Sequence, residues 1–441
     1  MVTLAAALKP LLRRPIALLG MGISGQAVDR LLHHLQVPRI RYDSKQGSAD
    51  RTTFGPSDLA QHSLAIYSPG FPPDHPWLSL ARQQNCTCMS ELDFASFFWP
   101  GPLIGITGTN GKTSLTEFLA FALRRGGGRD AIAVGNNGRP LASIIQENGT
   151  TGIDTTAVCE ISSFQAETLQ NLQLDALLWT NFADDHLDRH SSVQNYFLAK
   201  AKLIGRLRRP ALFLGKSVLK AAEHYRFNLP RFAQCVPGPD EREDGMDSPA
   251  PAAGVFDHEP QKENFLLARS YWLSQRLPEK ELYQAAIHFS LPPHRLSKVA
   301  SIAGIHFWND SKATNFAATL AALKRFSQPV VWLGGGRSKG EPIEPFIQTL
   351  TGEDKKAKNI KKVKAAFLLG EAAPELAKAF ESTKIAYQIS AGVEEAVRSG
   401  FAHAQTGDHI LFSPGFSSYD SFADFAERGG AFVRTVKTLK S

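Results

Sequence analysis

The sequence predicts an α/β protein of three domains, because short apolar strand-like runs alternate with amphipathic helical runs along most of the chain. Its 441 residues are too many for one ordinary hydrophobic core. Two glycine-rich loops, beginning at Gly20 and Gly108, each join a short apolar run to a helical one, and further apolar runs fill the last part of the chain. We therefore expect domains at residues 1–97, 98–298 and 299–441.

Composition excludes several classes of protein. The hydrophobic share of 43% and the charged share of 21% are those of a chain that folds in water, and no apolar run is long enough to span a bilayer. The net charge of +7 is concentrated, because residues 353–364 hold six lysines against two acids. We interpret that run as a solvated surface and expect neither nucleic-acid binding nor membrane insertion.

Cysteine usage and the first residues favour a cytoplasmic protein. The chain has four cysteines, Cys86, Cys88, Cys159 and Cys235. They lack the paired spacing of a zinc site and the density of a secreted disulfide scaffold. Arg13 and Arg14 precede an apolar stretch as in a signal peptide, but this stretch is short and breaks into glycines. We interpret it as a buried first strand.

The first glycine-rich loop predicts a Rossmann-like domain. Strands are expected at Ile16–Gly20 and Arg39–Asp43, with a helix at Ala27–Leu35 between them. Gly20-x-Gly22-x-x-Gly25 followed by Asp43 fits the dinucleotide fingerprint. A simple tight turn and a dehydrogenase are the alternatives. No group of residues typical of hydride transfer accompanies the motif.

The second loop, ITGTNGKT after the apolar run LIG, is the most specific motif and predicts a central domain of the P-loop ATPase type. Its glycines let backbone amides face an anion, and the following helix adds its positive end. Lys112 would reach the terminal phosphates and Thr113 a magnesium ion. Ile106 stands where a glycine is usual, and a tight turn with an exposed lysine is the alternative. The ATP-binding residues expected here are Gly108, Thr109, Asn110, Gly111, Lys112 and Thr113.

Acidic, histidine and lysine side chains follow the phosphate loop. Glu160 ends a strand-like run, and His186 and Lys200 lie in the blocks NFADDHLDRH and YFLAK. Hard cations prefer oxygen ligands, so a second metal could bind where these segments reach the edge of the sheet. Asp184 and Asp188 are expected at the surface.

The remaining pattern is typical of a second Rossmann-like domain at the C-terminus. Strands are expected in IHFWND, VVWLGGG, AAFLLG and HILFSPG, alternating with helices in a parallel sheet. We expect a helix at Val193–Leu207, and a surface segment at Pro237–Lys262, which is rich in Pro, Asp and Glu.

Together these blocks resemble the Mur ligase family. TGTNGKT, CEISSFQ, NFADDHLDRH, YFLAKAKL, PPHRL, NDSKATN, LGGG and SPGFSSYDSFADFAERG occur in the family's order, from about Ile16 to Phe432. The last blocks are most similar to members that add D-glutamate. Single blocks are shared with other Mur ligases and with folylpolyglutamate synthases.

The resemblance implies a cytoplasmic, monomeric ligase that uses ATP, two Mg²⁺ ions, UDP-N-acetylmuramoyl-L-alanine and D-glutamate. It implies an N-terminal domain that holds the UDP group. Metal ligands would be Thr113, Glu160, His186 and a carbamylated Lys200; with Lys112, the last three would be catalytic. Further ATP contacts would be Asn136, Asn264, Arg295 and Asp310. The chain departs from the family at Asn264, because a second amide three residues on is replaced by Leu267.

The resemblance also assigns the two substrate sites. The UDP-linked substrate would contact Ile23, Ser24, Gly25, Asp43, Ser44, Ser68, Gly70, Ser162 and Gln165. D-glutamate would contact Lys312, Thr314, Lys339, Ser418 and Phe425. Lys45 stands where the family usually has arginine. Phe425 also fits an amphipathic core stripe with Phe422 and Phe432.

The implied reaction forms an acyl phosphate from the substrate carboxylate and ATP, which the amino group of D-glutamate then displaces. Domain closure near residue 298 would assemble the site. The sequence reveals no general base for the amine. Another ligase of the same superfamily and a nucleotide-binding regulator without ligase activity are the alternatives.

Overall fold

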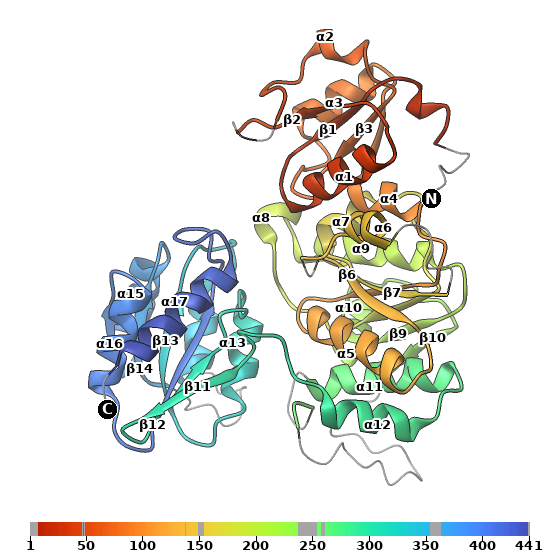
Figure 1. The fold of residues 1–441 in the computed structure, drawn as a ribbon. Coiled ribbons are helices and arrows are strands. Elements are labelled where there is room, and N and C mark those ends of the chain that lie inside the picture. The colour runs from red at the N-terminus through yellow and green to blue at the C-terminus, as the bar shows by residue number, and fades with distance from the viewer. Residues whose placement is uncertain are drawn as a thin grey trace. The chain divides into compact units, whose positions relative to one another are not determined.

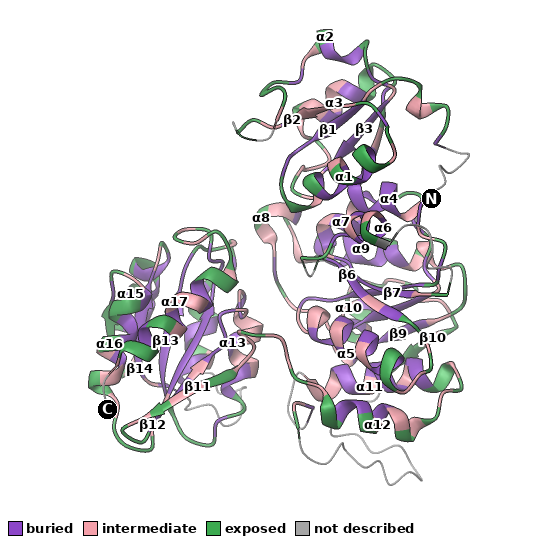
Figure 2. Ribbon diagram, in the orientation of Figure 1, coloured by how far each residue is buried: buried purple, intermediate pink, exposed green. Residues whose placement is uncertain are grey.

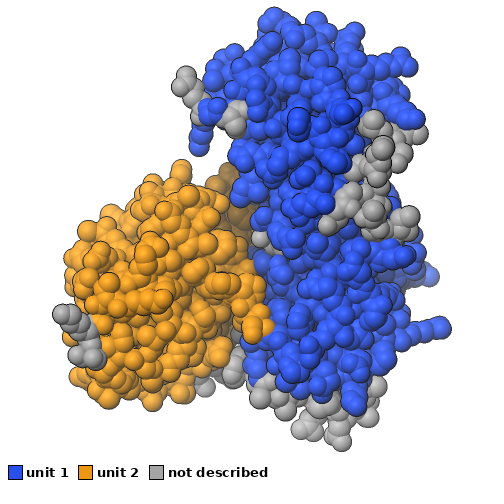
Figure 3. Space-filling view, in the orientation of Figure 1, with its two compact units in different colours: residues 1–182, 194–256, 262–289 blue, residues 183–193, 257–261, 290–441 orange. Residues whose placement is uncertain are grey.

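The computed structural model describes residues 8–45, 47, 49–136, 138–148, 154–236, 254–256, 261–352 and 363–439. The chain forms two compact units, residues 1–182, 194–256 and 262–289, and residues 183–193, 257–261 and 290–441 (Figure 3). The first unit holds two sheets and the second holds one (Figure 1). The predicted surface segment at 237–262 and the lysine run at 353–364 lie mostly outside the described residues.

The first sheet is parallel, with strand order β2-β1-β3-β4. Its strands are β1 (Ile16–Leu19), β2 (Arg39–Tyr42), β3 (Leu64–Tyr67) and β4 (Thr87–Ser90). The helices are α1 (Ile23–His34), α2 (Pro56–Leu59), α3 (Pro76–Gln83) and α4 (Glu91–Ser96), after a 3₁₀ turn at Leu11–Arg13. Helix α1 begins four residues earlier than predicted, directly after the glycine-rich loop.

The second sheet is also parallel, with strand order β10-β9-β8-β5-β7-β6. Its strands are β5 (Leu103–Thr107), β6 (Ala131–Gly135), β7 (Thr156–Glu160), β8 (Ala176–Trp179), β9 (Leu212–Leu214) and β10 (Ala233–Cys235). Its helices are α5 (Lys112–Arg125), α6 (Leu141–Asn148), α7 (Ser163–Thr168), α9 (Val193–Ala201), α10 (Lys216–His224), α11 (Gln261–Ser274) and α12 (Glu279–His288). The helix predicted at Val193–Leu207 is shorter, because the chain tightens into a 3₁₀ turn at Lys202–Arg206.

The third sheet has strand order β11-β12-β16-β13-β14-β15. Its strands are β11 (Ser297–Ile302), β12 (Ile305–Asn309), β13 (Val330–Gly335), β14 (Val363–Leu369), β15 (Ala386–Ile389) and β16 (His409–Gly415). Helices α13 (Phe316–Leu323), α14 (Ile343–Thr351), α15 (Ala373–Glu381), α16 (Val393–His403) and α17 (Phe425–Thr438) belong to the same unit, as does the short α8 (Leu187–His190).

One strand departs from the predicted parallel pattern. Strand β11 pairs antiparallel with β12, whereas the other pairings in this sheet are parallel. Ala303 and Gly304 join the two strands with φ of 49° and 74°. Two successive positive φ values are typical of a tight hairpin turn, which requires antiparallel strands.

Buried side chains point alternately to opposite faces along the strands, so the core forms on both faces of each sheet (Figure 2). In β8, Leu177 and Trp179 pack into one cluster, whereas Ala176 and Leu178 pack into the cluster that helices α5, α11 and α12 complete. In β13, Trp332 and its neighbour Leu333 likewise face opposite clusters. Helices therefore cover both faces, as a parallel sheet requires. No helix in the described ranges has both the length and the apolar character needed to cross a membrane.

A buried carboxylate joins α4 to the second sheet. Asp93 is 1% exposed, and its oxygens accept hydrogen bonds from the backbone amides of Gln170, Asn171 and Leu172 at 2.8–3.2 Å. The side-chain amide of Asn171 donates a further bond at 2.8 Å. Asp93 thus satisfies backbone donors that would otherwise be buried without partners.

We expect Asp93→Asn to lower the free energy of unfolding by about 2–4 kcal/mol, because an amide nitrogen replaces one of the accepting oxygens and leaves buried donors unsatisfied. Urea unfolding followed by circular dichroism would measure the change. Asp74→Asn, at an exposed position, is the matched control. Equal stability of the two variants would contradict this role for Asp93.

Candidate active site

The phosphate loop follows the central strand β5. The loops that follow the neighbouring strands β7 and β8 begin at the same edge of the sheet. Gly108 and Gly111 have φ of 147° and 80°. A Cβ atom on Gly108 would lie 1.9 Å from the Thr180 Oγ1, and one on Gly111 would lie 2.7 Å from the Asn264 Oδ1. Both positions therefore require glycine for conformational and steric reasons.

The end of β8 fixes this loop. Thr180 Oγ1 donates a hydrogen bond to the Asn110 carbonyl at 2.6 Å. The backbone amides of Thr109 and Asn110 donate to the carbonyl and side-chain oxygens of Asn181 at 3.0 and 2.8 Å. The amides of these two loop residues are thus used within the protein. The first backbone amides of α5 have no acceptor within the helix, so the beginning of α5 is a further place where an anion could bind.

Two lysines converge on one backbone oxygen. Lys112 Nζ donates to the carbonyl of Gly108 at 2.9 Å and to that of Thr109 at 2.8 Å. Lys200 Nζ, in a side chain 1% exposed, donates to the same Gly108 oxygen at 2.8 Å and lies 4.8 Å from the centre of the Tyr196 ring. The start of α5 and these ammonium groups make the loop strongly electropositive.

Glu160 supplies an acidic group at the same edge of the sheet. It ends β7, is 2% exposed, and lies in register with Ile106 of β5, two residues before the loop. Asn136 holds it from both sides, because its backbone amide donates to the Glu160 carbonyl at 2.9 Å and its side-chain amide donates to Oε1 at 3.3 Å. Asn136 itself is exposed.

These groups are compatible with a magnesium ion. Thr113, the second residue of α5, contributes a hydroxyl and Glu160 a buried carboxylate, and these are the oxygen donors that Mg²⁺ prefers. Over the described ranges, no three His, Cys, Asp or Glu side chains gather in a way that could hold a metal by themselves. Mg²⁺ keeps several waters and needs few protein ligands, so Thr113 and Glu160 could hold it together with nucleotide phosphates.

His186 and its neighbours belong to the second unit. His186 has φ of 55° and precedes α8. Its backbone amide donates to Asp185 Oδ1 at 2.9 Å, and its Nε2 lies 3.7 Å from Asp185 Oδ2. Burial opposes ionisation of Asp185, yet the ammonium of Lys339 at 2.8 Å holds the pKa of this carboxyl well below its usual range.

Two of the residues predicted to contact D-glutamate lie together in the second unit. Lys312 Nζ lies 3.8 Å from the centre of the Phe425 ring. Phe432 stacks on Phe412 in the core and Phe422 packs against the same cluster, whereas Phe425 belongs to no core cluster. The alternative interpretation of Phe425 as part of a core stripe is therefore wrong.

A buried arginine supports this region. Arg428, 1% exposed, donates to the carbonyls of Phe416, Ser417 and Ser311 at 2.9–3.2 Å and to the Ser311 hydroxyl at 3.1 Å. Burial lowers the pKa of its guanidinium to about 10. The sequence interpretation gave Arg428 no role, although it stands in the block AERG. It joins the segments that carry Lys312 and the buried Ser418.

The residues predicted to contact ATP from the second unit are Arg295 and Asp310. Asp310 accepts bonds from the Ser413 hydroxyl at 2.8 Å and the Leu296 amide at 3.0 Å. Burial raises the pKa of Asp310 to about 7. Arg295 is half-buried in the segment before β11, and Thr314 is half-buried just before α13.

The first glycine-rich loop is tightly packed against its own sheet. A Cβ atom on Gly25 would lie 1.9 Å from the Gly20 carbonyl oxygen, which also accepts the Ser68 hydroxyl at 2.9 Å. Asp43 accepts the backbone amides of Met21 at 2.7 Å and Lys45 at 2.9 Å. The Asp43 carboxylate therefore connects the glycine-rich loop to the segment after β2. Ile23, Ser44 and Gly70 are exposed, and Ser24 is half-buried.

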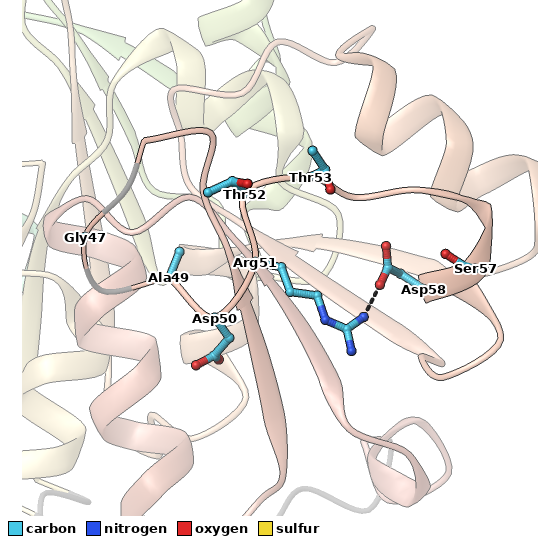
Figure 4. A pocket seen from close by; sticks show the side chains of 8 residues that line it. All are labelled: Gly47, Ala49, Asp50, Arg51, Thr52, Thr53, Ser57 and Asp58. Atoms are coloured by element: carbon cyan, nitrogen blue, oxygen red, sulfur yellow. Dashed lines mark hydrogen bonds and ion pairs between the residues drawn. The ribbon is translucent and has the colours of Figure 1, made fainter.

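A pocket lies in the segment after β2 (Figure 4). It is lined by Gly47, Ala49, Asp50, Arg51, Thr52, Thr53, Ser57 and Asp58. Arg51 forms an ion pair with Asp58, and Asp50 accepts two bonds from the Arg41 guanidinium at 3.0 and 2.6 Å. The sequence interpretation missed this segment, because its residue types are also those of an ordinary polar loop.

Three of the predicted ligand contacts already have structural partners. Ser162 and Gln165 form a reciprocal capping box at the beginning of α7. Asn264, 1% exposed, donates to the Gly111 carbonyl at 3.3 Å and thus lies beneath the phosphate loop. Contact of these residues with substrate or adenine remains a prediction.

The fold and the phosphate loop define a nucleotide-binding α/β protein built from three sheets. The Mur ligase middle domain family matches residues 106–232. The chain is 30% identical to UDP-N-acetylmuramoylalanine–D-glutamate ligase of Protochlamydia amoebophila over 96% of the chain and 97% of that protein. The protein of the same name from Streptococcus pyogenes is 28% identical over 97% of each chain. The chain therefore belongs to the UDP-N-acetylmuramoylalanine–D-glutamate ligase family of Mur ligases.

Solved structures agree on the fold. UDP-N-acetylmuramate-alanine ligase from Thermotoga maritima has a TM-score of 0.60 and 14% identity, with 97% of this chain and 100% of that chain covered. A pseudomurein peptide ligase from Methanothermus fervidus has a TM-score of 0.58 and 15% identity, with 96% and 100% covered. At this identity the likeness establishes the three-domain architecture alone.

We expect Asn181→Ala to weaken binding of ATP with Mg²⁺ by about tenfold, because the Asn110 amide of the phosphate loop loses the side-chain oxygen that orients it. Calorimetric titration with a non-hydrolysable ATP analogue would measure the affinity. Asn195→Ala, at an exposed position of α9, is the control. Affinity equal to that of the unchanged protein would show that the loop keeps its shape without Asn181.

Proposed function

We propose that this protein is the ATP-dependent ligase that adds D-glutamate to UDP-N-acetylmuramoyl-L-alanine during peptidoglycan precursor synthesis. The observation that carries the proposal is the convergence of Lys112 and the beginning of α5 on the loop around Gly108. Such a centre binds and neutralises phosphoryl oxygens. The near full-length similarity to ligases of this name supports the choice of substrates.

In the proposed reaction the carboxylate of the UDP-linked substrate attacks the γ-phosphorus of ATP, forming an acyl phosphate and releasing ADP. Lys112 and the first amides of α5 stabilise the charge on the phosphoryl oxygens. Bound Mg²⁺, held by Thr113 and Glu160 with His186 as a further candidate, would supply additional positive charge there. The amine of D-glutamate then attacks the acyl carbon, and phosphate leaves.

Lys200 would act in this reaction as a carbamate. As an ammonium it shares the Gly108 oxygen with Lys112, so two like charges approach one acceptor in a buried place. Addition of CO₂ to the neutral amine gives an anionic carbamate and releases a proton. The repulsion then becomes attraction, and the side chain gains oxygen atoms suited to Mg²⁺.

The carboxylates of D-glutamate would bind the cations and hydroxyls of the second unit, Lys312, Lys339, Thr314 and Ser418, with Phe425 beside Lys312. The buried cation of Arg428 favours an acidic amino acid over a basic one at this place. The UDP group would bind the first sheet through the loop at Ile23 to Gly25 and the segment at Asp43. We further propose residues 1–97, 98–298 and 299–441 as the UDP, ATP and amino-acid domains of a cytoplasmic monomer.

We expect phosphate release from ATP only when UDP-N-acetylmuramoyl-L-alanine and D-glutamate are both present. Lys112→Ala should reduce kcat about a hundredfold, because the phosphoryl charge loses its main cation. A coupled phosphate assay would measure both effects, with Lys220→Ala at an exposed position of α10 as the control. Phosphate release with L-alanine, L-lysine or meso-diaminopimelate instead of D-glutamate would contradict the assignment of D-glutamate as the substrate. Release with no amino acid would contradict the proposed ligase reaction.

Carbamylation of Lys200 makes activity depend on dissolved CO₂. Protein stored without bicarbonate should regain activity when bicarbonate is added, and isotopically labelled bicarbonate should give one carbamate signal in the carbon NMR spectrum that Lys200→Gln lacks. Lys202→Gln, two residues on and exposed, is the control. If the signal persists in Lys200→Gln, the carbamate lies elsewhere or is absent from this site.

A further inference from the structure

Charged side chains gather beside the beginning of α13 in the second unit. Lys339 Nζ donates to Asp185 Oδ1 at 2.8 Å, and the Asn315 side-chain amide donates to Asp185 Oδ2 at 3.0 Å. The side chains of Asp185 and Lys339 are 5% and 12% exposed. One carboxylate is thus matched with one ammonium in a place largely shielded from water.

Glu341 brings a second carboxyl group to this cluster. It is 8% exposed, and its Oε1 is buried without a hydrogen-bond partner. The backbone amide of Phe316 donates to the same carboxyl group. Burial raises the pKa of Glu341 to about 8. The negative charge of Asp185 adds to this effect, the positive charge of Lys339 opposes it, and Asp184 contributes least. The cluster therefore holds two carboxyl groups and one cation.

A buried acceptor without a partner is costly, and so is a carboxylate without a counter-charge. One additional group with N–H donors and a positive charge would correct both. The neighbouring residues Thr314 and Lys339 are those predicted to hold an amino acid, which carries an ammonium as well as carboxylates. Glu341 keeps 8% of its surface exposed, so it is not completely sealed in the core.

We propose that Glu341 binds the α-ammonium of the incoming amino acid. The loop between β13 and α14 then supplies both charges that a zwitterion needs, a cation at Lys339 for a carboxylate and an anion at Glu341 for the ammonium. The inference rests on the proposed function, because it takes the second unit as the amino-acid site. Glu341 ionises as the ammonium binds, since a positive charge at Oε1 favours the charged form.

Glutarate tests this assignment, because it carries the two carboxylates of D-glutamate without the ammonium. In E341Q we expect KM for D-glutamate to rise about tenfold or more, with kcat changed less and the inhibition constant of glutarate unchanged. E344Q, at an exposed position of α14 three residues further on, should behave as the unchanged protein. E341D, which keeps a carboxylate, should recover part of the affinity.

Equal losses for D-glutamate and glutarate in E341Q would overturn the inference, since they would indicate general damage to the site, and so would an unchanged KM. Turnover of the unchanged protein with a different amino acid would overturn only the choice of D-glutamate. The same comparison then uses that amino acid and its analogue without the amino group.

Thermal unfolding gives a readout independent of activity. A raised carboxyl pKa contributes stability that is complete below the unfolded value of 4.5 and is lost as pH rises through about 8. The unchanged protein should therefore lose melting temperature from about pH 5 to about pH 8 more steeply than E341Q. Identical slopes would show that Glu341 does not carry the buried titrating charge, and would overturn the inference.

Discussion

The contact between Gly108 and the end of β8 is the constraint on which the central site depends. Gly108 lies against Thr180 so closely that no side chain fits between them, and Asn181 holds the next two amides of the loop. This contact turns the Gly108 carbonyl toward Lys112 and Lys200. Because the carbonyl end of a peptide is negative, it can hold both ammonium groups near one point while no anion is bound.

The charge around the phosphate loop depends on neighbouring elements of the second sheet as well as on the glycine-rich motif. The glycines and Lys112 form a local pattern, but Thr180, Glu160 and Lys200 come from the ends of other strands and from a helix. Parallel strands place these ends along one edge. The two lysines are thus positioned by elements nearly a hundred residues apart, which makes the charge of the site a property of the sheet topology.

Local patterns allowed much of this to be predicted from the sequence. The strands and the two glycine-rich loops follow from short periodicities and turn chemistry, and the order of the blocks predicted the family. The antiparallel β11 was missed because its hairpin depends on positive φ at Ala303, a residue type that rarely adopts such a conformation.

Pairings between distant residues could not be predicted in this way. Asp184 and Asp185 look alike in sequence, yet Asp184 is exposed whereas Asp185 is buried with Lys339 and Asn315. Nothing in the sequence distinguishes Glu341 from the other acidic residues. Only the structure shows that its Oε1 is buried without a hydrogen-bond partner. Burial and charge balance depend on the folded surroundings, and a single sequence without its relatives does not contain them.

The two glycine-rich loops show how one backbone device serves two purposes. Both follow a parallel strand and precede a helix, so both present a helix N-terminus to an anion. The first contains no lysine or arginine between Gly20 and Gly25, and its acid, Asp43, is used by backbone amides. The second has Lys112 at the beginning of α5 and Lys200 of α9 beside it. In the proposed reaction Lys112 supplies positive charge to the phosphoryl group, and the carbamate of Lys200 would bind Mg²⁺. The two loops thus share one backbone arrangement and differ in the lysine side chains that lie beside them.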